Sequence, residues 1–154
     1  MGNIFYYNTP IGLVGITEQN DKITNLFFEC EDIDSKEYTI NESFILKEAN
    51  KQLQAYFNCQ LKEFTLPLAP VGTDFMTRVW EALRNIPYGE TRSYKDIAII
   101  IGNSKACRAV GMANNRNPIA IITPCHRVIG SKGDLVGYAG GLKIKSFLLD
   151  LEGD

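Results

Sequence analysis

A cysteine and a histidine are adjacent near the end of the chain, at Cys125 and His126, after Pro124 and an apolar run and before Arg127. A cysteine attacks as its thiolate, and a neighbouring base or positive charge lowers the thiol pKa from about 8.5. The pair therefore indicates nucleophilic chemistry at position 125. Because a single cysteine or histidine in an apolar run more often belongs to the core, this interpretation needs support from the rest of the chain.

The other cysteines indicate neither a cofactor nor a metal. Cys30, Cys59 and Cys107 form no CxxC pair and His126 is the one histidine of the chain, so neither a disulfide framework nor a usual zinc site is predicted. We expect free thiols, no metal and no cofactor. The chain opens without a secretory signal, and its apolar runs are far below the ~20 residues that cross a bilayer. We therefore expect a cytoplasmic protein with no membrane partner.

Basic residues are concentrated in one part of the chain. The net charge is −2, but residues 1–70 hold five lysines against ten acidic residues, whereas residues 84–132 hold eight basic residues against two acidic ones. This asymmetry indicates a surface that faces a polyanion, although a solvated face can also produce it.

Two short helices are predicted in the basic stretch. Ser93 and Asp96 form a capping pair ahead of a helix that Gly102 ends, and Ser104 is placed to cap a second helix that runs to about Asn114. A turn of about three residues separates them, as in helix-turn-helix DNA-binding units. A helical hairpin without a DNA-binding role fits the same pattern.

The second of these helices carries small side chains around one long cation, Arg108. Ala106, Ala109 and Gly111 offer little to read base edges in the major groove, but they permit close approach. Such a helix suits the minor groove, where Arg108 can be inserted into the base stack. The alternative is that the small residues pack against another helix.

The first half of the chain predicts a sheet and a helix. Three β-branched and aromatic runs, at 3–8, 13–18 and 23–29, predict an antiparallel meander. Apolar residues at helical spacing from Leu46 to Phe57 predict an amphipathic helix.

The connections divide the chain into two predicted domains. Residues 30–41 are acidic and poor in apolar residues, which predicts a loop, and residues 61–68 alternate as in a short strand. Prolines and a glycine then mark a linker before a helix that contains Phe75, Val79 and Leu83. We expect domains at 1–70 and 71–154.

Several short motifs occur together in the second half of the chain. They are IPYGETRSY at 86–94, RAVG at 108–111, RNP at 116–118, PCHRVIG at 124–130, GYAGGL at 137–142 and LEG at 151–153. In their order and spacing these motifs resemble the O6-alkylguanine-DNA alkyltransferases, the methylated-DNA:protein-cysteine methyltransferase family. The first 70 residues resemble this family only in general plan.

The resemblance implies an α+β fold, with a ribonuclease-H-like antiparallel sheet and helix in the N-terminal domain, which supports the second domain. The C-terminal domain would be mostly helical, with a winged-helix-like helix-turn-helix that binds DNA. The implied function is DNA repair by direct reversal, in which a flipped nucleotide loses its alkyl group irreversibly to a cysteine. The substrate would be O6-alkylguanine, and also O4-alkylthymine, in double-stranded DNA, and the protein would act as a monomer.

The same resemblance assigns roles to the chemical residues. Cys125 would accept the alkyl group and end as an S-alkylcysteine, in a single turnover. His126 would take the thiol proton through a water, and Glu152 would orient and charge that imidazole, as in a catalytic triad. Asn117 would tie the active-site turn to the DNA-binding helix.

Substrate contacts are implied in the same way. Arg108 would fill the space of the extruded base, and Ala106, Ala109 and Gly111 would allow the helix to approach DNA closely. Tyr94 would push on the target phosphate and donate to guanine N3. The backbone from Cys125 to Val128 would accept from the guanine amine, and Tyr138 and Ala139 would close the pocket near O6. Position 139 is serine in some members, so with Ala139 only the backbone N–H can bind O6.

Two other classes remain open from the residues alone. A helix-turn-helix regulator explains residues 93–114 but gives no use to PCHRV or LEG. A cysteine hydrolase would use Cys125, His126 and Asn117, although in that class the histidine usually lies far from the cysteine in the sequence.

Overall fold

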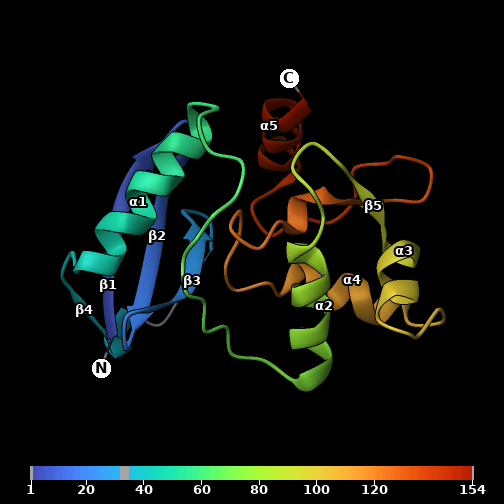
Figure 1. Cartoon of the computed structure of the whole chain (residues 1–154), viewed down its shortest axis with the longest axis horizontal. Helices are drawn as coiled ribbons and strands as arrows, with labels where there is room; N and C mark the ends of the chain where they lie inside the picture. Colours follow the sequence, from blue (N-terminus) through green and yellow to red (C-terminus); the bar gives the residue numbers. More distant parts are fainter. Residues whose placement is uncertain (1, 32–34, 154) are drawn as a thin grey trace. The chain divides into compact units, whose positions relative to one another are not determined.

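The computed structural model describes residues 2–31 and 35–153 and contains two compact units, Met1–Pro70 and Val71–Asp154 (Figure 1). Each unit has its own secondary structure and core. Within the described residues, no helix combines the length and the apolar character that a membrane span requires.

The first unit is built on a four-stranded sheet. Its strands β1 (Gly2–Thr9), β2 (Gly12–Gln19) and β3 (Lys22–Phe28) pair in antiparallel fashion, which confirms the predicted meander. Asn20 and Asp21, at φ 54° and 62°, form the two-residue turn between β2 and β3, since a positive φ at both positions matches the twist of a hairpin.

The prediction that residues 30–41 form a loop is wrong in part. A single-turn helix, η1 (Ser35–Glu37), leads into a strand, β4 (Tyr38–Ile40), which pairs with β1 in parallel, so the sheet order is β3-β2-β1-β4. The sheet is therefore mixed at this edge. Tyr38, Thr39 and Ile40 suit a strand, but three residues beside an acidic run are too few to show a period. Residues 32–34 of the predicted loop lie outside the described part.

Helix α1 (Phe44–Phe57) covers one face of strands β1, β2 and β3 (Figure 1). Leu46, Ala49, Leu53 and Tyr56 recur every three or four residues and are fully buried, which is the apolar face that the sequence predicts. The core of the first unit therefore lies between this helix and the sheet.

The predicted strand at 61–68 is absent from the described structure. Leu68 makes one isolated bridge to Ile23, with the Ile23 N–H donating to Pro67 O and the Ala69 N–H donating to Ile23 O, both at 2.8 Å. Pro67 and Pro70 have no N–H to continue a ladder, so the alternating pattern does not become a strand.

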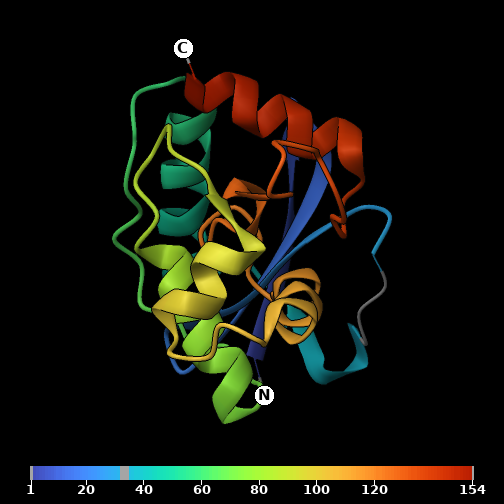
Figure 2. The same cartoon turned by 90° about the vertical axis from the view of Figure 1, so that its right-hand side faces the viewer.

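The second unit is mostly helical. Its helices are α2 (Asp74–Arg84), α3 (Tyr94–Ile100), α4 (Cys107–Asn115) and α5 (Leu142–Gly153), with a single-turn helix η2 (Cys125–Arg127) and two short parallel strands, β5 (Arg92–Ser93) and β6 (Val128–Ile129). Helices α2, α3 and α4 pack together around a core that includes Val79, Trp80, Leu83, Ile97, Val110, Ala113, Cys125 and Val128. Helix α5, which the sequence did not predict, lies at one end of this unit and contacts η2 (Figures 1 and 2).

Helix α3 begins as predicted. Ser93 accepts from the Asp96 N–H at 3.0 Å, and the Asp96 carboxylate accepts from the Ser93 N–H at 2.9 Å, which makes a reciprocal capping box. Gly102 follows the helix at φ 85°, a left-handed conformation that glycine adopts without strain.

Helix α4 begins later than predicted. Its N-cap is Ala106 with no side-chain hydrogen bond, so the prediction that Ser104 caps this helix is wrong. Asn103 instead closes the turn, since its side-chain oxygen accepts from the Lys105 N–H at 3.3 Å. Six residues separate the two helices rather than about three, because two turns replace the expected first helical turn.

Candidate active site

Helix η2 begins at Cys125, the predicted nucleophile. The buried turn that precedes it is held by hydrogen bonds of the Asn117 side chain. The Asn117 amide donates to the carbonyls of Ile119 (3.3 Å) and Thr123 (2.8 Å), and its oxygen accepts from the Ile119 N–H (3.1 Å). These bonds maintain a backbone in which Ile121 has a φ of 71°, which a β-branched residue adopts only where its surroundings impose it. The turn thereby fixes the position of Cys125, which is 5% exposed.

Three buried side chains form a hydrogen-bonded relay beside Cys125. The Nε2 of His126 lies 2.6 Å from Glu152 Oε2, and Arg127 donates from Nε to Oε1 (2.7 Å) and from Nη2 to Oε2 (3.0 Å). Arg127 also donates to the carbonyl of Ile86 at 2.7 Å and lies over the ring of Tyr88. Glu152 is therefore held in a buried ion pair, although a carboxylate in this part of the sequence could have been solvated.

The protonation of His126 follows from these contacts. Complete burial lowers the pKa of His126, the hydrogen bond and charge of Glu152 act to raise it, and the positive charges of Arg127 and Lys145 lower it further. The ring is therefore neutral at pH 7. Because the Glu152 carboxylate can only accept, Nε2 carries the proton, and the buried Nδ1, which has no partner in the described structure, keeps its lone pair. The ring is ready to take a proton at Nδ1.

A loop that spans residues 130–141 is held at two adjacent backbone carbonyls, those of Val136 and Gly137. Lys145 on α5 is fully buried and donates from Nζ to the carbonyl of Val136 (2.8 Å) and to that of Gly137 (3.5 Å). The hydroxyl of Tyr94 donates to the same Val136 carbonyl at 3.0 Å. Burial lowers the pKa of Lys145 and raises that of Tyr94, and the charge of Cys125 raises both, so all three groups share one environment.

Helix α4 is connected to Cys125 through a residue that the sequence analysis did not single out. Asn114 is 1% exposed, and its Nδ2 donates to the Cys125 carbonyl at 3.3 Å. The tie between the turn and this helix, which the resemblance assigns to Asn117, is thus made by Asn114, while Asn117 bonds within the turn. Trp80 donates from Nε1 to the carbonyl of Ala113 at 2.9 Å and fixes α4 to α2.

The residues predicted to face DNA are distributed along α4. Arg108 and Ala109 are exposed, and Ala106 and Gly111 are partly exposed. A Cβ on Gly111 would lie 3.8 Å from the ring of Tyr94, so this position brings the helix close to that side chain. Gly111 therefore packs near Tyr94, whereas Arg108 and Ala109 remain accessible on the surface of the helix.

The residues predicted to line the lesion pocket differ in exposure. Val128 is fully buried in the core, Tyr138 is partly buried against it, and Ala139 is exposed. Tyr138 and Ala139 both lie on the 130–141 loop, so the position of this loop decides how they meet a substrate.

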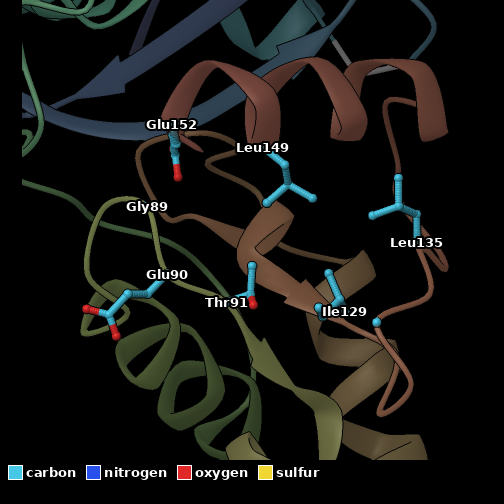
Figure 3. A pocket seen from close by; sticks show the side chains of 8 residues that line it. Gly89, Glu90, Thr91, Ile129, Leu135, Leu149 and Glu152 are labelled. Atoms are coloured by element: carbon cyan, nitrogen blue, oxygen red, sulfur yellow. The ribbon is translucent and has the colours of Figure 1, made fainter. Parts of the chain in front are cut away.

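A pocket of about 200 Å³ opens beside the relay carboxylate (Figure 3). Its lining residues are Gly89, Glu90, Thr91, Ile129, Gly133, Leu135, Leu149 and Glu152. Its lining is mostly apolar apart from two carboxylates and a hydroxyl, and Cys125 and His126 are not among the lining residues. In residues 2–31 and 35–153, no group of three or more His, Cys, Asp or Glu residues is arranged to hold a metal ion.

Comparisons with known proteins agree with the motifs. Residues 74–154 match the family model described as 6-O-methylguanine DNA methyltransferase, DNA binding domain, and residues 5–70 match the ribonuclease-like domain of the same methyltransferase. The chain is 53% identical over 149 residues to a methylated-DNA–protein-cysteine methyltransferase of Methanosarcina acetivorans, and the match covers 96% of this chain and 96% of the relative. It is 51% identical to the constitutive enzyme of that name from Bacillus subtilis, over 96% of this chain and 94% of the relative.

Solved structures show the same relationship. The crystal structure of Mycobacterium tuberculosis OGT in complex with DNA matches with a TM-score of 0.93 at 46% identity, and covers 97% of this chain and 92% of the other. The fold and the site define a protein with a DNA-binding domain that holds a buried cysteine next to a hydrogen-bonded histidine and glutamate. The chain belongs to the 6-O-methylguanine DNA methyltransferase family, as the motifs predicted, and the α+β fold expected from them is confirmed.

Proposed function

We propose that this protein repairs DNA by direct reversal and transfers an alkyl group from O6 of guanine to Cys125. The observation that carries this proposal is the buried relay of His126 and Glu152 next to a cysteine, within a unit that matches the DNA-binding domain of the family. A helix-turn-helix regulator would give no use to such a relay.

The proposed reaction begins with the thiol. The Cys125 proton passes through a water to His126 Nδ1, and the imidazolium is stabilised by Glu152 through Nε2–H. The thiolate attacks the alkyl carbon, the S–C bond forms as the O6–C bond breaks, and the electron pair of that bond stays on the guanine. Tyr94 donates to guanine N3, so the base leaves without full negative charge. The product is a thioether, which has no easy leaving group, so each molecule reacts once.

The proposed DNA contacts use helix α4. The alkylated base lies inside the stack and has to be extruded, at a cost of a few kcal/mol, with Arg108 filling its place. Ala106, Ala109 and Gly111 let the helix approach the groove, and Val128, Tyr138 and Ala139 surround the base.

We further propose that the protein works as a monomer in the cytoplasm, where reducing conditions keep its cysteines out of disulfides. In this proposal residues 71–154 bind DNA and accept the alkyl group, and residues 1–70 form a supporting domain. O4-alkylthymine is a second substrate of the same site.

The test is transfer of a labelled methyl group from duplex DNA that contains O6-methylguanine. We expect one methyl per molecule, located on the Cys125 peptide by intact-mass and peptide analysis, with Cys30, Cys59 and Cys107 unmodified. Cys125→Ser should bind DNA and transfer nothing measurable. Repeated turnover by unmodified protein, or label on another cysteine, would contradict the proposal.

A further inference from the structure

Asn114 carries a buried hydrogen-bond acceptor that the described protein leaves unused. The orientation of its amide is fixed, because the Cys125 carbonyl can only accept and so must face the Asn114 NH2 group. The other end, Oδ1, is buried and has no partner in the described structure. A buried acceptor without a partner is uncommon in native proteins and points to a donor supplied from outside.

The neighbouring asparagine shows what a purely structural role looks like. Asn117 is also buried, and both ends of its amide are engaged by the backbone of its own turn. Asn114 differs because its Nδ2 donates to the backbone of the residue proposed to react, while its Oδ1 is buried without a partner in the described structure. The amide nitrogen is bonded to the carbonyl of Cys125 itself, so the unpartnered oxygen at the other end of the same amide lies close to the residue proposed to react.

The chemistry of the alkylated base identifies the donor. Alkylation at O6 removes the hydrogen from guanine N1, so the Watson–Crick edge then displays acceptors at O6 and N1 and a donor at the exocyclic amine alone. O4-alkylthymine has acceptors at N3 and O2 on this edge and no donor. The amine of the guanine lesion can therefore donate a hydrogen bond to an acceptor next to Cys125. The thymine lesion has no donor on this edge and would place one of its own acceptors there.

We propose that Asn114 Oδ1 accepts a hydrogen bond from the exocyclic amine of the extruded O6-alkylguanine and makes the protein prefer guanine lesions to thymine lesions. This inference rests on the alkyl-transfer function proposed above. Asn114 is then a specificity-determining residue, since sites built to bond a substrate N–H discriminate against analogues that lack it. The bond from Asn114 Nδ2 to the Cys125 carbonyl fixes the position of the Asn114 side chain relative to Cys125.

The experiment removes the donor, the exocyclic amine of the base, and then the acceptor, Asn114 Oδ1. Single-turnover transfer rates are measured with the full-length protein, on identical duplexes that contain O6-methylguanine or O6-methylhypoxanthine, which lacks the amine. In the parent, loss of the amine should slow transfer about two- to tenfold, as expected for one neutral hydrogen bond. In Asn114→Leu, whose side chain has a similar shape, this ratio should fall below the parent value, and the part that remains belongs to the backbone acceptors of Cys125–Val128.

The ratio of the two transfer rates separates recognition of the amine from other effects of replacing Asn114. Loss of the bond to the Cys125 carbonyl slows both substrates equally and leaves the ratio unchanged. Asn85→Ala, at an exposed asparagine at the end of α2, should keep the parent ratio. Asn114→Leu should also narrow the preference for O6-methylguanine over O4-methylthymine.

Two results would overturn the inference: equal parent rates on the two purine substrates, or a parent-like ratio in Asn114→Leu. The first needs no variant, so it can refute the inference even if Asn114→Leu does not fold, and Asn114→Ala then supplies the second comparison. A parent protein that transfers no methyl from either substrate would refute the proposed function itself.

Discussion

Replacing Glu152 by glutamine tests the relay at its most buried contact. The substitution keeps the shape of the side chain and removes the charge that accepts from His126 Nε2 at 2.6 Å. The imidazole then loses the group that stabilises its positive form. We expect alkyl transfer at neutral pH to slow, because the thiolate of Cys125 is no longer favoured by an oriented base.

The size of the effect depends on pH in a defined way. A thiol with an ordinary pKa of about 8.5 is about 10% ionised at pH 7.5 and about half ionised at pH 8.5. Because the relay removes the thiol proton in the parent reaction, whereas the variant depends on thiol that is already ionised, Glu152→Gln should be slower by about tenfold at pH 7.5 and about twofold at pH 8.5. Burial of Cys125 opposes ionisation without the relay, so these figures are minimum losses.

The same substitution affects stability through Arg127. This guanidinium makes two contacts with the Glu152 carboxylate, and removing one partner of a buried pair costs about 3–5 kcal/mol. For a chain of this length, that corresponds to a fall in Tm of roughly 6–20 °C. The double variant Glu152→Gln with Arg127→Met removes the unpaired cation, so it should recover much of the stability while the relay stays broken.

The assay is single-turnover methyl transfer from pH 6.5 to 9.5, with a thermal melt of each variant. We expect both variants to be slow at pH 7.5 and to approach the parent rate as the pH rises, while binding to undamaged duplex is unchanged. A folded variant with the parent rate at pH 7.5 would refute the relay. A loss that stays constant across the pH range would show that Glu152 acts on the geometry and not on proton transfer.

Three further predictions follow from other contacts. Arg108→Ala should slow repair of duplex DNA far more than reaction with free O6-substituted guanine, which needs no extrusion, and equal losses in the two rate assays would place Arg108 elsewhere in the mechanism. Ser93→Ala should lower the free energy of unfolding by about 1 kcal/mol, or roughly 2–4 °C in Tm, because it removes the cap of α3; a melt that matches the parent would contradict this. Burial holds the pKa of His126 below its ordinary value in the folded protein. As the pH falls through about 6.5, His126 is therefore protonated in the unfolded chain but stays neutral in the folded one. Stability contributed by neutral His126 is therefore lost as the pH falls below about 6.5, and His126→Asn should flatten this part of a melt series between pH 7.5 and 5.

The sequence predicted the elements that have a clear period or a clear boundary. The three strands of the meander, α1 and the capping box of α3 all follow from local residues, and the family motifs indicated Cys125 as the proposed acceptor. Strand β4 and helix α5 were missed for different reasons. Three residues of β4 are too short to show alternation, and the apolar residues of α5 are distributed around the helix rather than along one face.

The contacts that complete the site depend on tertiary structure. A lysine on a helix such as Lys145 is normally exposed, and no pattern in the sequence shows that it is buried against the Val136 carbonyl. Asn114 stands beside another asparagine on α4, and only packing distinguishes the buried one from the exposed one. Glu152 is buried because Arg127 and His126 converge on it from a distant turn.

The Val136 carbonyl that binds both Tyr94 and Lys145 has a consequence for the energetics of substrate exchange. In the proposed reaction Tyr94 donates to the base, so it would give up one neutral hydrogen bond and gain another, and the exchange would have little net free energy. The vacated carbonyl keeps Lys145 as a donor, so it is not left unsatisfied in the interior. In that scheme the hydrogen bonds at Val136 would favour neither the empty nor the occupied site by much, so discrimination between bases would have to come from other contacts.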